Sequence, residues 1–177
     1  MTQTNSKWEL SLAKGEYAES IIKKYFEARG FVIYSTEKKD KAHAFDILAT
    51  KNKSDFMIVD VKAKARRTRY ADTGINLSHF NEYAAVRDKY KMPVWIVFVD
   101  EASAAIYGNA LSDTGLLKPA VLSGKTYPLI ENTMSGKSII YFPLANMATI
   151  AKLSDEDVLE LKKMSAKTRN YSYDLNY

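Results

Sequence analysis

The sequence contains no cysteine, so disulfide bonds and thiolate metal sites are excluded, and a reducing compartment, the cytoplasm, is the expected location. No apolar run approaches the length that a membrane-spanning helix needs. The N-terminal region carries Lys7, Glu9, Lys14 and Glu16 where a secretory signal would need an apolar centre. These absences predict a cytoplasmic protein with no membrane segment.

Signals for several enzyme classes are missing as well. The two histidines, His43 and His79, lie too far apart for a zinc-binding helix motif. Segments 124–126 and 136–138 read Gly-Lys-Thr and Gly-Lys-Ser, but neither has the glycine that a Walker A loop needs five residues earlier. No Ser-His-Asp set can be argued from the sequence. A nucleotide cofactor, a zinc site and a serine hydrolase triad are therefore not expected.

What is present suffices for one folded domain, since the chain has 177 residues, of which 46% are hydrophobic and 27% charged. The net charge of +5 is unevenly placed: ten basic and four acidic residues lie between Lys38 and Arg69, and the remainder is nearly neutral. A local basic field suits a polyanionic partner. The ordinary alternative is a solvated run of lysines, which the acidic residues at strand positions disfavour.

The segment Asp55–Lys64 is the most informative part of the chain. Its first half is apolar and rich in β-branched residues, which predicts a buried strand. Because side chains alternate across a strand, Asp60 and Lys62 fall on one face, and Val59 and Val61 on the other. Charges in such a strand are costly to desolvate without partners. Two interpretations are open: an ion pair within an exposed edge strand, or a metal-binding carboxylate followed by a catalytic lysine.

A helical pattern precedes this strand, from Leu12 to Arg29, and Gly30 is placed to end it. At about 100° per residue, Glu19 borders the apolar stripe, whereas Glu16 projects into the polar face. A carboxylate at the margin of a core is unusual. Its ordinary explanation is an i,i+4 pair with Lys23.

The other periodicities predict the order of the remaining elements. Asp46 lies near the start of an apolar strand, where β-propensity disfavours aspartate. Segment 66–74 is basic and polar and is expected to be a mobile loop. The expected elements are strands over 31–35 and 44–50, the central strand, a helix that Asn76 or Ser78 caps and that runs to about residue 91, a strand over 94–99, strand-like pieces over 105–111, 120–122 and 138–142, a short helix over 143–150 and a last helix from Ser154.

This order, with carboxylates on the first helix and on the second and third strands and a lysine two residues after the last, resembles the PD-(D/E)xK nuclease superfamily. The resemblance implies an α/β protein of restriction-endonuclease-like fold, with an αβββαβ core and a mixed central sheet. It implies a nuclease core over 1–100, and residues 101–177 then form a C-terminal β-hairpin and helix extension packed on that core, in a single domain overall.

The match extends from about Lys14 to Val99 and is most similar to the small endonucleases of the Holliday-junction-resolvase type. Those enzymes have a glycine four residues before the helix glutamate, here Gly15, and a lysine-rich loop before the first aspartate, here 38–41. Phe45 stands where the motif usually has proline, and His79 stands roughly where several relatives have glutamine, so its role is open.

The resemblance implies that the metal ligands are Glu19, Asp46, Asp60 and the backbone carbonyl of Val61, and that Lys62 is the catalytic lysine. Hard cations such as Mg²⁺ prefer oxygen ligands, and Mn²⁺ is expected to substitute. A bound metal lowers the pKa of its water and offsets charge on the phosphodiester, and a lysine beside it can orient the water or stabilise the oxyanion. The implied activity is metal-dependent hydrolysis of DNA, either structure-specific like a resolvase or restriction-like.

The expected partner is DNA, and a homodimer is a candidate assembly, on which the aromatic tail 171–177 could dock. The residues expected to bind nucleic acid through its phosphates are Lys38, Lys39, Lys41, Lys64, Arg66, Arg67 and Arg69. The alternative function is a non-catalytic nucleic-acid-binding or assembly protein on the same fold. Retention of all four signature side chains favours the enzyme, and the clustered charge disfavours a purely structural protein with an accidental pattern.

Overall fold

The computed structural model describes residues 6–35, 45–52, 54–64, 66–113, 115–119, 121–122, 124–126, 128–133 and 136–165. In order, its elements are α1 (Lys7–Glu27), β1 (Val32–Ser35), β2 (Ile47–Thr50), β3 (Phe56–Lys62), β4 (Asp72–Asn76), α2 (Leu77–Tyr90), β5 (Val94–Asp100), β6 (Ala105–Ala110), β7 (Val121–Leu122), β8 (Lys125–Thr126), β9 (Ile130–Asn132), β10 (Ser138–Pro143), the 3₁₀ turn η1 (Leu144–Asn146), β11 (Ala148–Lys152) and α3 (Asp155–Lys163).

A six-stranded mixed sheet with the order β1-β2-β3-β5-β6-β11 forms the centre of the molecule. Strands β1, β2 and β3 pair antiparallel, and β3 pairs parallel with β5. The element order α1, β1–β3, α2, β5 is the αβββαβ core of the restriction-endonuclease-like fold, with the short strand β4 inserted before α2. The predicted fold class is confirmed. Because β6 and β11 extend the same sheet beyond β5, the chain on both sides of residue 100 contributes to it.

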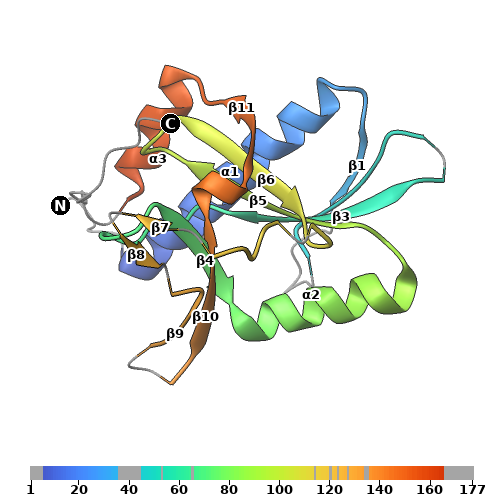
Figure 1. Ribbon diagram of the computed structural model, residues 1–177. Helices are drawn as coiled ribbons and strands as arrows, with labels where there is room; N and C mark the ends of the chain where they lie inside the picture. The colour runs from blue at the N-terminus through green and yellow to red at the C-terminus, as the bar shows by residue number, and fades with distance from the viewer. Residues whose placement is uncertain are drawn as a thin grey trace.

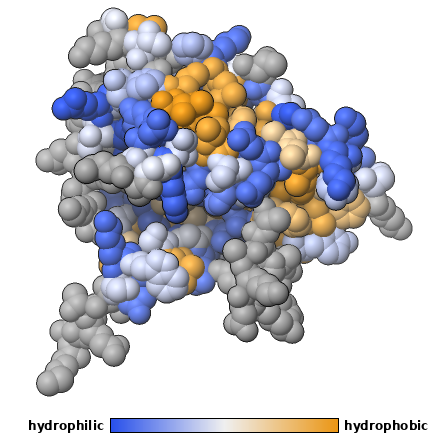
Figure 2. All heavy atoms as spheres, turned by 90° about the horizontal axis from the view of Figure 1, so that it is seen from below, coloured by the Kyte–Doolittle hydropathy of each residue, from blue (hydrophilic) through white to orange (hydrophobic). Residues whose placement is uncertain are grey.

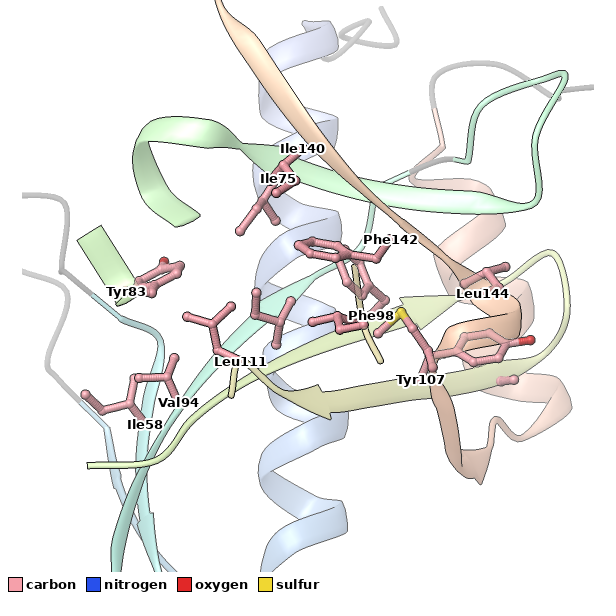
Figure 3. Close-up of a cluster of buried hydrophobic side chains, with 14 residues drawn as sticks. Ile58, Ile75, Tyr83, Val94, Phe98, Tyr107, Leu111, Ile140, Phe142 and Leu144 are labelled. Atoms are coloured by element: carbon pink, nitrogen blue, oxygen red, sulfur yellow. The ribbon is translucent and has the colours of Figure 1, made fainter. Parts of the chain in front are cut away.

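The two faces of this sheet carry different layers (Figure 1). Helices α1 and α3 pack on one face through a cluster that includes Ala18, Ile22 and Leu161 and the sheet residues Val59 and Val97. Helix α2 and a three-stranded sheet of order β4-β10-β9 cover the other face. Figure 3 shows the buried cluster of that second layer, in which the Phe142 ring of β10 packs against the Phe98 ring of β5 at 5.9 Å between centroids.

Local sequence explains where the helices begin and end. Helix α1 starts five residues before the predicted position because Ser6 and Glu9 form a reciprocal capping box, in which each side chain accepts from the other's backbone N–H. Gly30, with φ of 80°, lies just beyond its end. Helix α2 follows Asn76 as predicted and ends at Lys91, which adopts a left-handed conformation.

Two predicted elements are wrong. The segment expected to be a mobile loop over 66–74 includes β4, which pairs with the distant strand β10. The close approach requires Gly74, since a Cβ there would lie 2.5 Å from the Ile140 carbonyl oxygen. The helix expected over 143–150 is instead the turn η1 followed by β11. In both places pairing with a remote strand overrides the local pattern.

No helix in the described ranges has both the length and the apolarity needed to cross a membrane. Seen from below, the surface shows apolar patches set between hydrophilic residues (Figure 2). The exposed large apolar side chains of the described residues come from several elements and connecting segments: Trp8, Leu12, Val32, Tyr34, Tyr90, Val121, Ile130 and Leu159.

Candidate active site

Asp60 is the most deeply buried of the predicted catalytic residues. It lies in β3 opposite Ile96 of the parallel strand β5 and is 1% exposed. Its Oδ1 accepts two short hydrogen bonds of 2.6 Å, one from Lys62 Nζ and one from the Tyr83 hydroxyl of α2. Its Oδ2 is buried and accepts no hydrogen bond from any part of the chain that the structure describes. Among the described residues, one oxygen of this carboxylate has two donors and the other has none.

Lys62 joins Asp60 to a second carboxylate. Its Nζ lies 3.6 Å from Asp46 Oδ2, and that same oxygen accepts a 2.7 Å hydrogen bond from the Val61 backbone N–H. The side chains of Lys62 and Asp46 are 19% and 24% exposed, against 1% for Asp60. The site therefore opens outward, from a buried aspartate through a lysine to a partly exposed aspartate. The structure brings together three of the four predicted catalytic residues.

Burial controls the electrostatics of this cluster. Desolvation raises the pKa of Asp60 above the ordinary aspartate value, although the Lys62 ammonium acts in the opposite direction. Burial would lower the pKa of Lys62, but the charges of Asp60 and Asp46 outweigh it and raise that pKa, so the lysine stays protonated. Burial and the adjacent Asp60 charge also raise the pKa of Tyr83, which keeps its phenol a hydrogen-bond donor.

The donor set fits a hard divalent cation. Mg²⁺ takes oxygen ligands, commonly one or two carboxylates completed by water and substrate phosphate. An unbonded carboxylate oxygen in a buried place is costly, and a cation would satisfy it. Among the residues with described positions, however, no three His, Cys, Asp or Glu side chains gather closely enough to hold a metal. The protein thus offers two carboxylates, Asp46 and Asp60, at this place.

Glu19, the fourth predicted residue, lies elsewhere. Helix α1 packs on the Val59 and Val61 face of the sheet, opposite the face on which Tyr83 reaches Asp60. Glu19 is half-buried and Glu16 is exposed, as the helical phase predicts, and both line a shallow depression on α1. The structure does not bring Glu19 into one group with the two aspartates.

The predicted phosphate contacts separate into three sets. Lys38, Lys39 and Lys41 fall outside the described residues. Lys64 and Arg69 are exposed. Arg66 and Arg67 instead make ion pairs inside the protein: Arg66 with Asp100, and Arg67 with Asp72 and Glu131.

The expectation that Arg66 contacts phosphate is wrong for this structure, because the residue is 1% exposed. Its Nε donates to Asp100 Oδ1 at 3.1 Å, and its second contact to Asp100 completes a bidentate pair. The side chain of Arg67 is 12% exposed and stacks over the Tyr141 ring at 3.7 Å from its centroid. Both arginines lie in the segment that the sequence predicts to be a basic loop. The sequence of such a segment does not reveal which guanidinium groups point into the protein.

The sequence interpretation missed Tyr83. Tyr83 lies on the buried side of α2, is 7% exposed and belongs to the core cluster between α2 and the central sheet (Figure 3). The signal that could have revealed its role is the hydroxyl itself, because a buried tyrosine needs a hydrogen-bond partner. His79, one turn earlier, is exposed, and its ring lies 6.5 Å from that of Tyr83.

Comparisons with known proteins give structural similarity only. No protein-family model and no curated protein matches the sequence. Among solved structures, the chain is similar to Archaeoglobus fulgidus Hjc, a Holliday junction resolvase, with 12% identity over 78% of this chain and 93% of that chain and a TM-score of 0.49. It is also similar to a nuclease from a fusselovirus, with 11% identity over 83% and 87% of the two chains and a TM-score of 0.45.

Proposed function

We propose that this protein is a metal-dependent endodeoxyribonuclease that hydrolyses phosphodiester bonds in DNA. The observation that carries the proposal is the arrangement of Asp46, Asp60 and Lys62, in which a buried carboxylate keeps one oxygen without a described hydrogen-bond partner. A purely structural ion pair has no use for an unsatisfied buried oxygen, which lowers stability. A site that receives a divalent cation does need such an oxygen, because the oxygen can bind the cation.

Each residue of the cluster has a role in this proposal. Asp46 and Asp60 hold Mg²⁺ or Mn²⁺, with the Val61 carbonyl and Glu19 as further predicted ligands. When bound, the cation supplies Lewis-acid chemistry: it lowers the pKa of a bound water and offsets charge on the phosphodiester. Lys62 stays protonated between the two aspartates, so it can donate hydrogen bonds to an attacking water or to a phosphate oxygen.

The wider surface positions the substrate. Lys64 follows Lys62 by two residues, and Arg69 is exposed in the segment after it, so both supply positive charge in the part of the chain that follows the cluster. Contacts of lysine and arginine with phosphates fix the position of a duplex without reading its sequence. We also propose that Lys38, Lys39 and Lys41 contact phosphates. The proposed cutting is structure-specific, like that of a resolvase, or restriction-like. The proposed protein is a cytoplasmic homodimer.

The test is cleavage of a DNA panel that contains linear, nicked, flap and four-way-junction substrates, each with Mg²⁺, with Mn²⁺ and with a chelator. The expected result is cutting that requires the metal and is lost in Lys62→Met, a variant that keeps the length of the side chain. Preference for the junction would identify resolvase-like activity. Metal-independent binding of every substrate without cutting would overturn the enzyme and favour the nucleic-acid-binding alternative.

The contribution of α1 has a matched pair of variants. Glu19→Gln and Glu16→Gln make the same chemical change one turn apart on one helix. If Glu19 completes the metal site, its variant loses cleavage, and the Glu16 variant stays close to wild type. Equal activity of the two variants would remove Glu19 from the ligand set and leave the two aspartates as the carboxylate ligands.

A further inference from the structure

Tyr83 of α2 contacts the candidate site but is not one of its four predicted catalytic residues. Tyr83 sits in the buried layer between α2 and the central sheet, and its hydroxyl donates to Asp60 Oδ1 at 2.6 Å. A tyrosine has two side-chain torsions and a rigid ring, so packing the ring fixes the position of the hydroxyl. The core of the protein therefore dictates where one oxygen of Asp60 lies.

The two oxygens of Asp60 are treated unequally. Oδ1 accepts from both Lys62 and Tyr83, whereas Oδ2 has no hydrogen-bonding partner within the described ranges. If Tyr83 served only to satisfy a buried carboxylate, the bare oxygen would be the favourable acceptor, because each unsatisfied buried acceptor is costly. The hydroxyl instead adds a second bond to the oxygen that already has one. Such an arrangement fixes the rotation of the carboxylate and leaves Oδ2 open.

We propose that Tyr83 is a positioning residue that holds Asp60 Oδ1 and thereby keeps Oδ2 available for the divalent cation. This inference rests on the proposed function, since it concerns the metal ligand of that site. It assigns to α2 a direct part in the metal site.

A second consequence concerns Lys62. Its side chain is long and 19% exposed, and its Nζ has three N–H donors, so it can shift from Asp60 toward a substrate phosphate or water. Tyr83 stays bonded to Oδ1 during that movement, because its ring is packed in the core. The lysine can therefore exchange partners while the aspartate keeps its orientation. Partners that orient a metal ligand typically contribute about 10- to 100-fold to metal affinity or activity.

The experiment measures Mn²⁺ affinity by calorimetry on the full chain without DNA, so its readout does not depend on catalysis. Tyr83→Phe removes only the hydroxyl. Tyr107→Phe is the matched control, because Tyr107 is equally buried at 7%, belongs to the same core cluster and donates to Ser103 Oγ at 3.0 Å, away from the cluster of Asp60. We expect Tyr83→Phe to weaken Mn²⁺ binding about 10-fold and Tyr107→Phe to leave it unchanged.

Two further variants make every outcome decisive. Asp60→Asn reports on the site: if it binds Mn²⁺ like wild type, the proposed metal site and this inference both fail. If it loses Mn²⁺ while Tyr83→Phe keeps wild-type affinity, the inference about Tyr83 fails and the proposed function stands. Lys62→Met tests the same point without changing the core: with Tyr83 still bonded to Oδ1, affinity stays at or above the wild-type value. A 10-fold loss in Lys62→Met would make the lysine the positioning group and overturn the role of Tyr83.

Discussion

Two buried aspartates, Asp60 and Asp100, each pair with a basic side chain. They differ in how many of their carboxylate oxygens accept hydrogen bonds. Asp100, at the end of β5, has both oxygens engaged: Oδ1 accepts from Arg66, and Oδ2 accepts from Arg66 and from the backbone N–H and hydroxyl of Ser103. Asp60, in the neighbouring strand β3, has two bonds on one oxygen and none from the described residues on the other. Both aspartates are nearly inaccessible to water.

The difference separates a structural ion pair from a candidate catalytic one. A buried pair stabilises only when its geometry is good and the remaining lone pairs are satisfied. Both oxygens of Asp100 meet that condition, and the pair of Arg66 and Asp100 ties the segment after β3 to the turn after β5. The pair of Lys62 and Asp60 does not meet that condition, and its second carboxylate, Asp46, lies 3.6 Å from the lysine Nζ. The unsaturated cluster is the one expected to bind a ligand.

The largest expected effect is on cleavage. Asp60→Asn removes a metal ligand and should abolish detectable cutting, and Lys62→Ala should lower the single-turnover rate constant about 10²- to 10³-fold, since it removes a donor to developing charge. The measurement is single-turnover cleavage in saturating Mg²⁺. Asp88→Asn and Lys89→Ala on the exposed face of α2 are charge-matched controls that should cut like wild type. Full activity of either site variant would remove that residue from the mechanism.

For the free energy of unfolding, the larger effect is expected at Asp100 and the smaller one at Asp60. Asp100→Asn leaves Arg66 buried beside a neutral partner and should cost about 3–5 kcal/mol of unfolding free energy. Asp60→Asn should cost less than Asp100→Asn, because Lys62 is 19% exposed and keeps Asp46 at 3.6 Å as a second charged partner, whereas Arg66 is 1% exposed. Urea denaturation of the two variants measures this. Equal losses would mean that both clusters are structural.

A third ion pair, Arg67 with Asp72, should make the stability of the protein depend on pH. Burial raises the pKa of Asp72 to about 6, against the opposing effect of Arg67 and with Glu131 nearby. A raised folded-state pKa contributes stability at low pH that is lost as pH rises from about 4 to about 6. At about 1.4 kcal/mol per pKa unit, the loss reaches at most about 3 kcal/mol.

The measurement is the stability of wild type and of Asp72→Asn across that pH window. Wild type should lose stability relative to the variant as pH rises, because the variant lacks the titrating carboxyl. A constant difference between them would mean that Arg67 keeps Asp72 ionised throughout this window.

The smallest effect concerns DNA affinity. Because Arg66 and Arg67 pair within the protein, the exposed Lys64 and Arg69 are expected to supply the phosphate contacts of this segment. Replacing both by alanine should reduce the log-log salt slope of duplex binding by about two, at about 0.9 per contact. Affinity across a salt series in Ca²⁺ measures it. Lys152→Ala with Lys162→Ala, which removes the same charge from β11 and α3, should keep the slope; equal slopes for both double variants would contradict the assignment.

Sequence patterns sufficed for the order of the core elements, whereas the grouping of Asp46, Asp60 and Lys62 in one site was implied by the family resemblance. Each of these residues lies on a regular strand or at its start, where alternation decides the face. The polar–apolar phase of α1 likewise predicted that Glu19 is more buried than Glu16. These features depend on local periodicity.

The features that sequence reasoning missed depend on remote contacts. The inward direction of Arg66 is set by Asp100, which lies 34 residues later. Strand β4 forms because β10 lies beside it, and its own sequence, Asp-Thr-Gly-Ile-Asn, has little strand propensity. Tyr83 acquires its role from a hydroxyl that meets a neighbouring strand. None of these partners can be identified from a window of adjacent residues.

The pairing of β4 with β10 also determines when the candidate site can assemble during synthesis of the chain. Gly74 pairs with Tyr141, so the small sheet that packs with α2 over Asp60 requires a strand made much later in synthesis. Contacts so distant in sequence form slowly, and on the ribosome they must wait until the second strand emerges. The carboxylates and Lys62 are synthesised early, but the layer that holds Tyr83 against them is completed late. A nascent chain truncated before β10 would therefore carry every signature residue and still lack an assembled site.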